Sequence, residues 1–180
     1  LEVVQGAFIG DWGYMEEIGR QRIRALDLVA AMQEYLISSR KIVPDLPAYV
    51  AQRGEAPEKV VINFLKTLDG KARFREETVA VVRQYPEVSF VSGGVGNIEI
   101  IHKSAGKGSA LLKLGELLGI GRTEIMAVGD SENDLDMIEK AGLGVAMANG
   151  EEIVKAHADV LTGSNDDDGA AAAVEAYVLD

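Results

Sequence analysis

The chain has 180 residues, of which 47% are hydrophobic and 26% are charged, and its formal net charge is −11. This balance is typical of one or two folded domains and excludes a disordered chain. So negative a surface repels the phosphates of nucleic acids and anionic lipid head groups, so we expect neither nucleic acid nor membrane as a partner. The absence of cysteine, of a signal-peptide pattern and of a long apolar run leads us to expect a cytoplasmic protein.

The first hundred residues have the pattern of a small α+β sheet covered by helices on one face. Strands are expected at 1–9, 14–18, 59–65, 88–91 and 98–101, helices at 22–37, 46–52 and 74–85, and a turn at 11–13. Asp45 has the form of a helix N-cap, because Leu46 and Pro47 come after it as a first helical turn. The glycine-rich segment 92–97 is expected to join the last two strands as a hairpin.

The pattern changes after His102. Helices expected at 106–118, 133–140, 151–157 and 170–178 alternate with strands expected at 124–128, 143–147 and 160–161. This alternation predicts an α/β fold of parallel strands with helical crossovers. Three short strands are too few for a complete doubly wound sheet, so we expect this part to be completed by a second copy of the chain, as a homodimer, or by a segment outside these residues.

The clearest chemical signal lies between Ala127 and Asp134. An apolar strand ends in Gly129-Asp130, and a second carboxylate, Asp134, lies at the start of the next helix. Ligands of open α/β sheets bind at the carboxyl ends of the strands. Two carboxylates that converge there make a hard oxygen site suited to Mg²⁺. Taken separately, the two aspartates are an ordinary turn residue and a helix N-cap, but the whole string favours the metal site.

Gly129 to Asp134 resembles the fourth motif of haloacid-dehalogenase-type phosphatases, in particular the Cof-like branch with type IIB caps. The segments 144–150 and 158–169 resemble the family's sequence on the C-terminal side of that motif, and 106–108 resembles the third motif with its lysine. The resemblance implies a Rossmann-like phosphatase core, present in part at 101–180. It also implies an α+β cap at 1–100 that closes over the site and selects the substrate.

The resemblance also implies roles for single residues. Asp130 would bind Mg²⁺ directly, and Asp134 would hold a metal-bound water or orient the site. Lys107, at a helix N-terminus, would neutralise the phosphate and the attacking carboxylate. The candidate substrate contacts are Ser131, Asn133 and Asn149. Asn149 could instead simply form a turn.

The nucleophile of these enzymes is missing. They attack phosphorus with the first Asp of an Asp-x-Asp-Gly-Thr motif, and a second motif supplies a Ser or Thr for the phosphate. Neither motif precedes the cap-like region. The segment 67–71 resembles a degenerate first motif, but Thr67 stands at the nucleophile position, so we expect only a turn. We therefore expect that the chain begins inside the cap, that the nucleophile lies in a segment before Leu1, and that these residues alone are inactive.

These observations support three hypotheses for the function. The leading hypothesis is a Mg²⁺-dependent hydrolase of small phosphorylated metabolites such as sugar phosphates. The alternative is a non-catalytic module of the same fold that binds phosphate and Mg²⁺ without turnover. An unrelated Rossmann-like nucleotide binder ranks last, because the glycines at 93, 94 and 96 do not open a helix.

Overall fold

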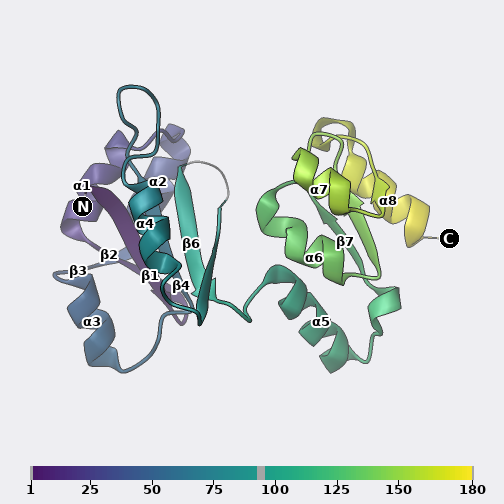
Figure 1. The fold of residues 1–180 in the computed structure, drawn as a ribbon, viewed down its shortest axis with the longest axis horizontal. Coiled ribbons are helices and arrows are strands. Elements are labelled where there is room, and N and C mark those ends of the chain that lie inside the picture. Colours follow the sequence, from purple (N-terminus) through teal and green to yellow (C-terminus); the bar gives the residue numbers. More distant parts are fainter. Residues whose placement is uncertain (1, 93–95, 180) are drawn as a thin grey trace. The chain divides into compact units, whose positions relative to one another are not determined.

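The computed structural model describes residues 2–92 and 96–179, so Leu1, which the first predicted strand included, lies outside the described residues (Figure 1). Contacts divide the chain into two units of contiguous sequence, Leu1–Lys103 and Ser104–Asp180. Across the described ranges, no helix is both long enough and apolar enough to cross a membrane.

The first unit is built on a six-stranded sheet in the order β3-β2-β1-β4-β6-β5. Its strands are β1 (Val3–Ile9), β2 (Trp12–Glu16), β3 (Arg40–Val43), β4 (Lys59–Phe64), β5 (Val88–Val91) and β6 (Asn97–His102). Neighbouring strands are antiparallel except β2 and β3, which are parallel. The predicted strands are confirmed with small shifts of their ends. β3 was not predicted, because it is short and begins with two charged residues.

β1 and β2 form a tight hairpin. Ile9 pairs with Trp12, which leaves Gly10 and Asp11 as the turn, and Gly10 has a φ of 59°. A positive φ at the first turn residue suits the right-handed twist of the strands and favours glycine. The predicted turn therefore exists but lies at 10–11 and not at 11–13, since Trp12 and Gly13 already belong to β2.

The helix predicted at 22–37 is confirmed only in part, because the segment is not one continuous helix. The segment contains the end of α1 (Glu17–Arg22), a 3₁₀ turn (Ile23–Ala25) and α2 (Ala30–Ser38). Leu26 has φ −74° and ψ 142°, an extended conformation that interrupts helical hydrogen bonding. Ile23 and Leu26 are both buried in one hydrophobic cluster. The apolar residues that resembled the stripe of a single helix are therefore buried in one tertiary cluster by separate segments.

The two faces of the sheet differ in what covers them. On one face, apolar strand residues pack against α3 (Leu46–Arg53) and α4 (Arg75–Val82). α2 lies against the opposite face, where its Leu36 packs beside Val4 and Met15. The prediction that helices cover only one face is therefore wrong. Strand side chains alternate between faces, and the register places Lys59, Asn63, Asn97 and Glu99 on the face that α2 partly covers.

The start of α3 confirms the predicted cap. The Asp45 side chain accepts a hydrogen bond from the Ala48 N–H at 2.8 Å, and Pro47 occupies the first turn, where a missing N–H is tolerated. Gly54 ends the helix with a φ of 68°, the left-handed conformation that glycine adopts readily.

Two further segments of the first unit were expected to be turns. The segment 67–71 is a turn, as expected: the Lys71 N–H donates to Thr67 Oγ1 at 3.1 Å, and Thr67 Oγ1 also bonds Asp69. The hairpin predicted at 92–97 lies partly outside the described residues, because 93–95 are not among them. The strands on either side of it, β5 and β6, are antiparallel neighbours.

The second unit is α/β, with a three-stranded parallel sheet in the order β7-β8-β9 (Figure 1). Its elements are α5 (Lys107–Leu118), β7 (Met126–Gly129), α6 (Leu135–Lys140), β8 (Leu143–Ala146), α7 (Glu152–His157), β9 (Val160–Leu161) and α8 (Gly169–Tyr177). Ile138, Ala146 and Val154 form its most deeply buried cluster. The predicted alternation of parallel strands and helical crossovers is confirmed. β7 starts later than predicted, because Arg122–Glu124 is a 3₁₀ turn.

Replacing Asp45 by alanine removes the side chain that caps α3, and we expect it to lower the free energy of unfolding by about 1 kcal/mol. Urea denaturation followed by circular dichroism measures the change. Asp45→Asn is the matched control, because asparagine caps a helix about as well as aspartate. Equal losses in the two variants would contradict a role for this hydrogen bond.

Candidate active site

Asp130 comes directly after β7, at the carboxyl end of a parallel strand. Its N–H donates to Asp134 Oδ2 at 3.1 Å, and its carbonyl accepts a hydrogen bond from the Glu151 N–H at 2.7 Å. The side chain itself is exposed, and within the described ranges no hydrogen bond or ion pair engages its carboxylate. The backbone of Asp130 is therefore fixed from two sides while its carboxylate stays open to a ligand.

Asp134 lies beneath this loop and is only 6% exposed. Its Oδ2 accepts hydrogen bonds from the N–H groups of Asp130 and Ser131, the latter at 3.4 Å, and its Oδ1 accepts one from Lys107 Nζ at 2.5 Å. A Cβ atom at Gly129 would lie 2.5 Å from the Cβ of Asp134. Glycine before Asp130 is therefore a steric condition for burying the Asp134 side chain.

Two opposing effects act on the pKa of Asp134. Burial raises the pKa, while the hydrogen bonds from Lys107 and from the Asp130 N–H lower it. The hydrogen bonds outweigh burial, so the pKa is lowered and the carboxylate is ionised at neutral pH. Asp134 thus acts as a charged acceptor that joins Lys107 to the loop after β7.

Lys107 is positioned by the close approach of α5 to α6. A Cβ atom at Gly106 would lie 2.2 Å from Asp136 Oδ2, and one at Gly108 would lie 2.2 Å from the Asp136 carbonyl oxygen. Asp136 Oδ2 accepts hydrogen bonds from the N–H groups of Gly108 and Ser109, at 2.9 and 3.4 Å. The two glycines let the first turn of α5 contact α6, and the lysine between them reaches Asp134.

Asp136 is the residue of this arrangement that the sequence analysis did not single out. It caps α5 from a neighbouring helix and forms an ion pair with Lys140 at 2.6 Å. Burial raises its pKa, but the hydrogen bonds from Lys140 and Gly108 outweigh burial and lower it. The available signal was the pair of glycines on either side of Lys107, which indicates a close approach by another backbone.

The three predicted substrate contacts separate into two groups. Ser131 Oγ donates to Asn133 Oδ1 at 2.6 Å, so these two lie together in the loop beside Asp130. Asn149 Oδ1 instead accepts a hydrogen bond from the Asn165 N–H at 2.8 Å, which joins two loops of the second unit. No hydrogen bond in the described part of the chain links the Asn149 side chain to Asp130 or Asp134.

The donor set fits Mg²⁺ with one direct ligand. Residues 2–92 and 96–179 contain no group of three or more His, Cys, Asp or Glu side chains that could hold an ion. Mg²⁺, however, commonly uses one or two carboxylates and completes its octahedron with water and substrate oxygens. Asp130 offers an unengaged carboxylate, whereas the oxygens of Asp134 are already occupied by Lys107 and backbone N–H groups. Asp130 is therefore suited to direct ligation and Asp134 to orienting the site.

The sequence matches a protein family and several known phosphatases. The family model for haloacid dehalogenase-like hydrolases matches residues 32–174. A 5-amino-6-(5-phospho-D-ribitylamino)uracil phosphatase of Bacillus subtilis is 38% identical over 131 residues, which are 71% of this chain and 52% of that protein. A phosphoglycolate phosphatase of Methanosarcina acetivorans is 48% identical over 69 residues, 38% of this chain and 30% of that protein.

Solved structures agree with these matches. A haloacid dehalogenase-like hydrolase from B. subtilis superposes with a TM-score of 0.73 at 26% identity, and the match covers 98% of this chain and 65% of that one. The chain spans about half the length of the uracil-derivative phosphatase from the same organism, 52%.

Replacing Gly108 by alanine tests the close contact between α5 and α6. Helix propensity alone favours alanine over glycine, but the added Cβ would meet the Asp136 backbone, so we expect a loss of about 1–3 kcal/mol in the free energy of unfolding. Urea denaturation measures it. Lys113→Ala, on the exposed side of α5, should change stability by less than about 0.5 kcal/mol. A Gly108→Ala variant with a higher free energy of unfolding than the parent chain would show that α5 and α6 are not in close contact there.

The lowered pKa of Asp134 predicts a pH-dependent contribution to stability. This contribution is complete above the unfolded pKa of 3.8 and is lost as the pH falls through the lower folded pKa. Asp134→Asn should therefore be less stable than the parent chain at about pH 6, and the difference should shrink toward about pH 3. Urea denaturation at several pH values gives the comparison. A difference that stays constant over this range would show that the pKa is not lowered.

Proposed function

Because the chain belongs to the haloacid dehalogenase-like hydrolases, we propose that it provides the metal-binding and substrate-selecting parts of a phosphatase for small phosphorylated metabolites. The observation that carries the proposal is the arrangement at the end of β7: an open carboxylate, Asp130, beside a lysine that a buried carboxylate holds in place. The curated relatives support it, because their names describe phosphatases of small, oxygen-rich phosphate esters.

Lys107 binds the phosphate, and Asp134 orients Lys107. The Lys107 side chain is 50% exposed, so its ammonium can contact phosphate oxygens while Asp134 fixes its position. Asp130 is the ligand for Mg²⁺, whose charge, when bound, stabilises the charge that develops on the phosphoryl group. Ser131 and Asn133 are candidate contacts to the substrate oxygens.

The nucleophile in this proposal is a carboxylate outside the 180 residues, since no Asp-x-Asp-Gly-Thr motif occurs in the sequence. Within the described residues, β7 has a hydrogen-bonded neighbour, β8, on one side only. The other edge can accept a further parallel strand, and a carboxylate at the end of that strand would lie near Asp130. It would attack phosphorus and expel the alcohol, and water would then hydrolyse the aspartyl-phosphate.

The first unit is the proposed cap. Its role would be to select among phosphorylated metabolites, of which sugar phosphates are the leading class. Lids of this kind exclude water and complete a site when they close. The strongly negative chain remains an unsuitable partner for nucleic acids and anionic membranes.

The test uses the longest product of the reading frame that contains this sequence, assayed for release of phosphate from sugar phosphates and phosphoglycolate in the presence of Mg²⁺. Asp130→Asn and Lys107→Met should each lower kcat/KM by about 100-fold or more. The first weakens the binding of Mg²⁺, and the second removes the ammonium group that stabilises the charge on the phosphoryl group.

Glu132→Gln is the matched control, because Glu132 is exposed in the same loop, and it should leave the rate within about twofold. Full activity of Asp130→Asn would contradict the assignment. Binding of Mg²⁺ without turnover of any substrate would favour the non-catalytic module.

A further inference from the structure

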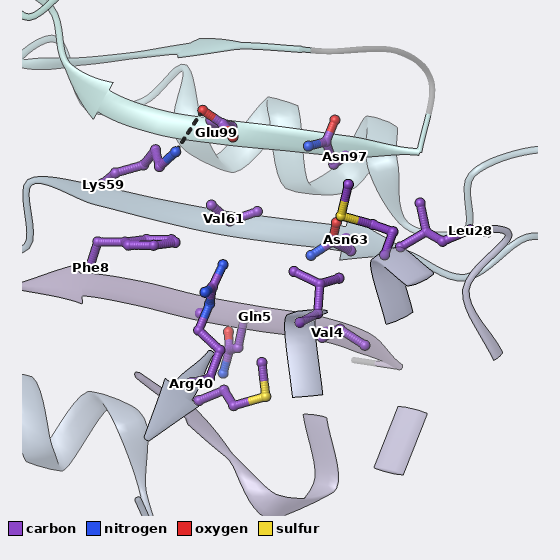
Figure 2. Close-up of a pocket in the computed structure, with 14 residues that line it drawn as sticks. Val4, Gln5, Phe8, Leu28, Arg40, Lys59, Val61, Asn63, Asn97 and Glu99 are labelled. Atoms are coloured by element: carbon purple, nitrogen blue, oxygen red, sulfur yellow. Dashed lines mark hydrogen bonds and ion pairs between the residues drawn. The ribbon is translucent and has the colours of Figure 1, made fainter. Parts of the chain in front are cut away.

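A hollow of about 300 Å³ lies on the face of the first unit's sheet that α2 only partly covers (Figure 2). Its floor is formed by strand residues and its wall by the segment that leads into and through α2. The strand register sets its side chains in three adjacent rows. These rows are Arg40–Gly13–Phe8–Lys59, Gly6–Val61–Glu99 and Val4–Asn63–Asn97.

The first row brings two cations to one aromatic ring. Arg40 Cζ lies 4.5 Å from the centroid of Phe8, and Lys59 Nζ lies 4.9 Å from the same centroid. Figure 2 shows Arg40 and Lys59 reaching this ring from different strands. Gly13 makes room for the arginine, because a Cβ atom there would lie 2.5 Å from Arg40 Cδ.

The hollow carries a local excess of positive charge in a chain whose formal charge is −11. Lys59 pairs with Glu99 at 3.1 Å, and Glu99 is the acidic residue of the lining. Arg40 donates to Ser39 Oγ at 2.7 Å and, in the described ranges, forms no ion pair with a carboxylate. A guanidinium without an acidic partner in a concave site is suited to binding an anion.

The third row supplies amides without protein partners. In the part of the chain that the structure describes, the side chains of Asn63 and Asn97 make no hydrogen bond. Gly6 lies in the floor between Val4 and Phe8. Its φ is not positive, but a Cβ atom there would lie only 3.2 Å from the Tyr14 carbonyl oxygen. A larger side chain at Gly6 would occupy the hollow, so the glycine keeps it open.

Polar side chains alone would also be found on a sheet face that is only exposed to water. The apolar side chains around them distinguish this hollow from such a face. Leu28 and Met32 stand beside the polar rows, 37% and 45% exposed, and Val61 lies in the floor. Apolar walls with a few convergent polar groups are typical of small-molecule sites.

We propose that the hollow binds a small anionic polyol, such as a sugar phosphate or a sugar acid. Its anionic group contacts Arg40 and Lys59, its hydroxyl groups bond the amides of Asn63 and Asn97, and its carbon skeleton lies over Gly6 and Val61 in the row between them. The claim that the hollow binds such a ligand does not depend on the proposed phosphatase function. The claim that the ligand is the substrate rests on that function.

The first experiment measures binding alone. Isothermal titration calorimetry is performed on the 180-residue chain carrying Lys107→Ala, which removes the proposed phosphate-binding lysine of the second unit. Glucose 6-phosphate and gluconate are the probes, and glucose is the neutral comparison. We expect at least one anionic probe to bind more tightly than glucose, and Arg40→Met to weaken that binding about tenfold.

Lys41→Met is the matched control, because Lys41 is on the same strand, its side chain lies against Trp12 on the other face, and the charge change is the same. It should leave the affinity unchanged. Asn97→Ala, at a half-buried position at the start of β6, serves as a second variant if Arg40→Met unfolds, and it should also weaken binding. Absence of binding by both anionic probes, or equal affinity in Arg40→Met and Lys41→Met, would overturn the proposal.

Kinetics on the longer protein identify the source of the ligand. If the ligand is the substrate, Arg40→Met raises KM about tenfold at nearly constant kcat for an ester that carries a second anionic group. If the ligand is an effector, gluconate changes the rate of the parent enzyme and not that of Arg40→Met. Inactivity of the longer protein would overturn the proposed function and leave the calorimetric result in force.

Discussion

The candidate site of the second unit depends on the hydrogen bonds that the buried carboxylate of Asp134 accepts. It accepts hydrogen bonds from Lys107 and from the Asp130 N–H, so one side chain joins the start of α5 to the end of β7. A buried charge without such partners would be strongly destabilising, so burial and hydrogen bonding require each other here. Gly129 meets the steric condition by leaving room for the Asp134 side chain. The open carboxylate of Asp130 is a consequence of this arrangement, because its backbone is held and its side chain is left unengaged.

Anion binding by so negative a chain requires local concentrations of positive charge, and each unit contains one. In the second unit, Lys107 stands at the N-terminus of α5; in the first, Arg40 and Lys59 stand over Phe8. The fields of such groups act over short distances at physiological salt, so the overall charge of −11 does not prevent them from binding a phosphate. The same overall charge disfavours long anionic polymers, which would meet the whole surface.

The sequence was most informative where local chemistry decides the structure. The apolar strand ending in Gly129-Asp130 and the cap at Asp45 are both encoded in short patterns, and both are confirmed as structural features. The break at Leu26 was not predictable, because burial of that side chain in a tertiary cluster interrupts a helical pattern. The role of Asp136 and the hollow around Phe8 were also missed. Both depend on elements distant in sequence, and neither helix packing nor strand register is visible from spacing alone.

The coupling between Lys107 and Asp134 is the most direct measure of the central interaction. A double-mutant cycle with Lys107→Met, Asp134→Asn and the double variant compares their free energies of unfolding, followed through hydrogen exchange of the β7 amides. We predict a coupling energy of about 1 kcal/mol or more, because the ion pair is partly buried and shares a hydrogen-bond network. Additive losses, with a coupling below about 0.3 kcal/mol, would contradict the view that this carboxylate organises the site.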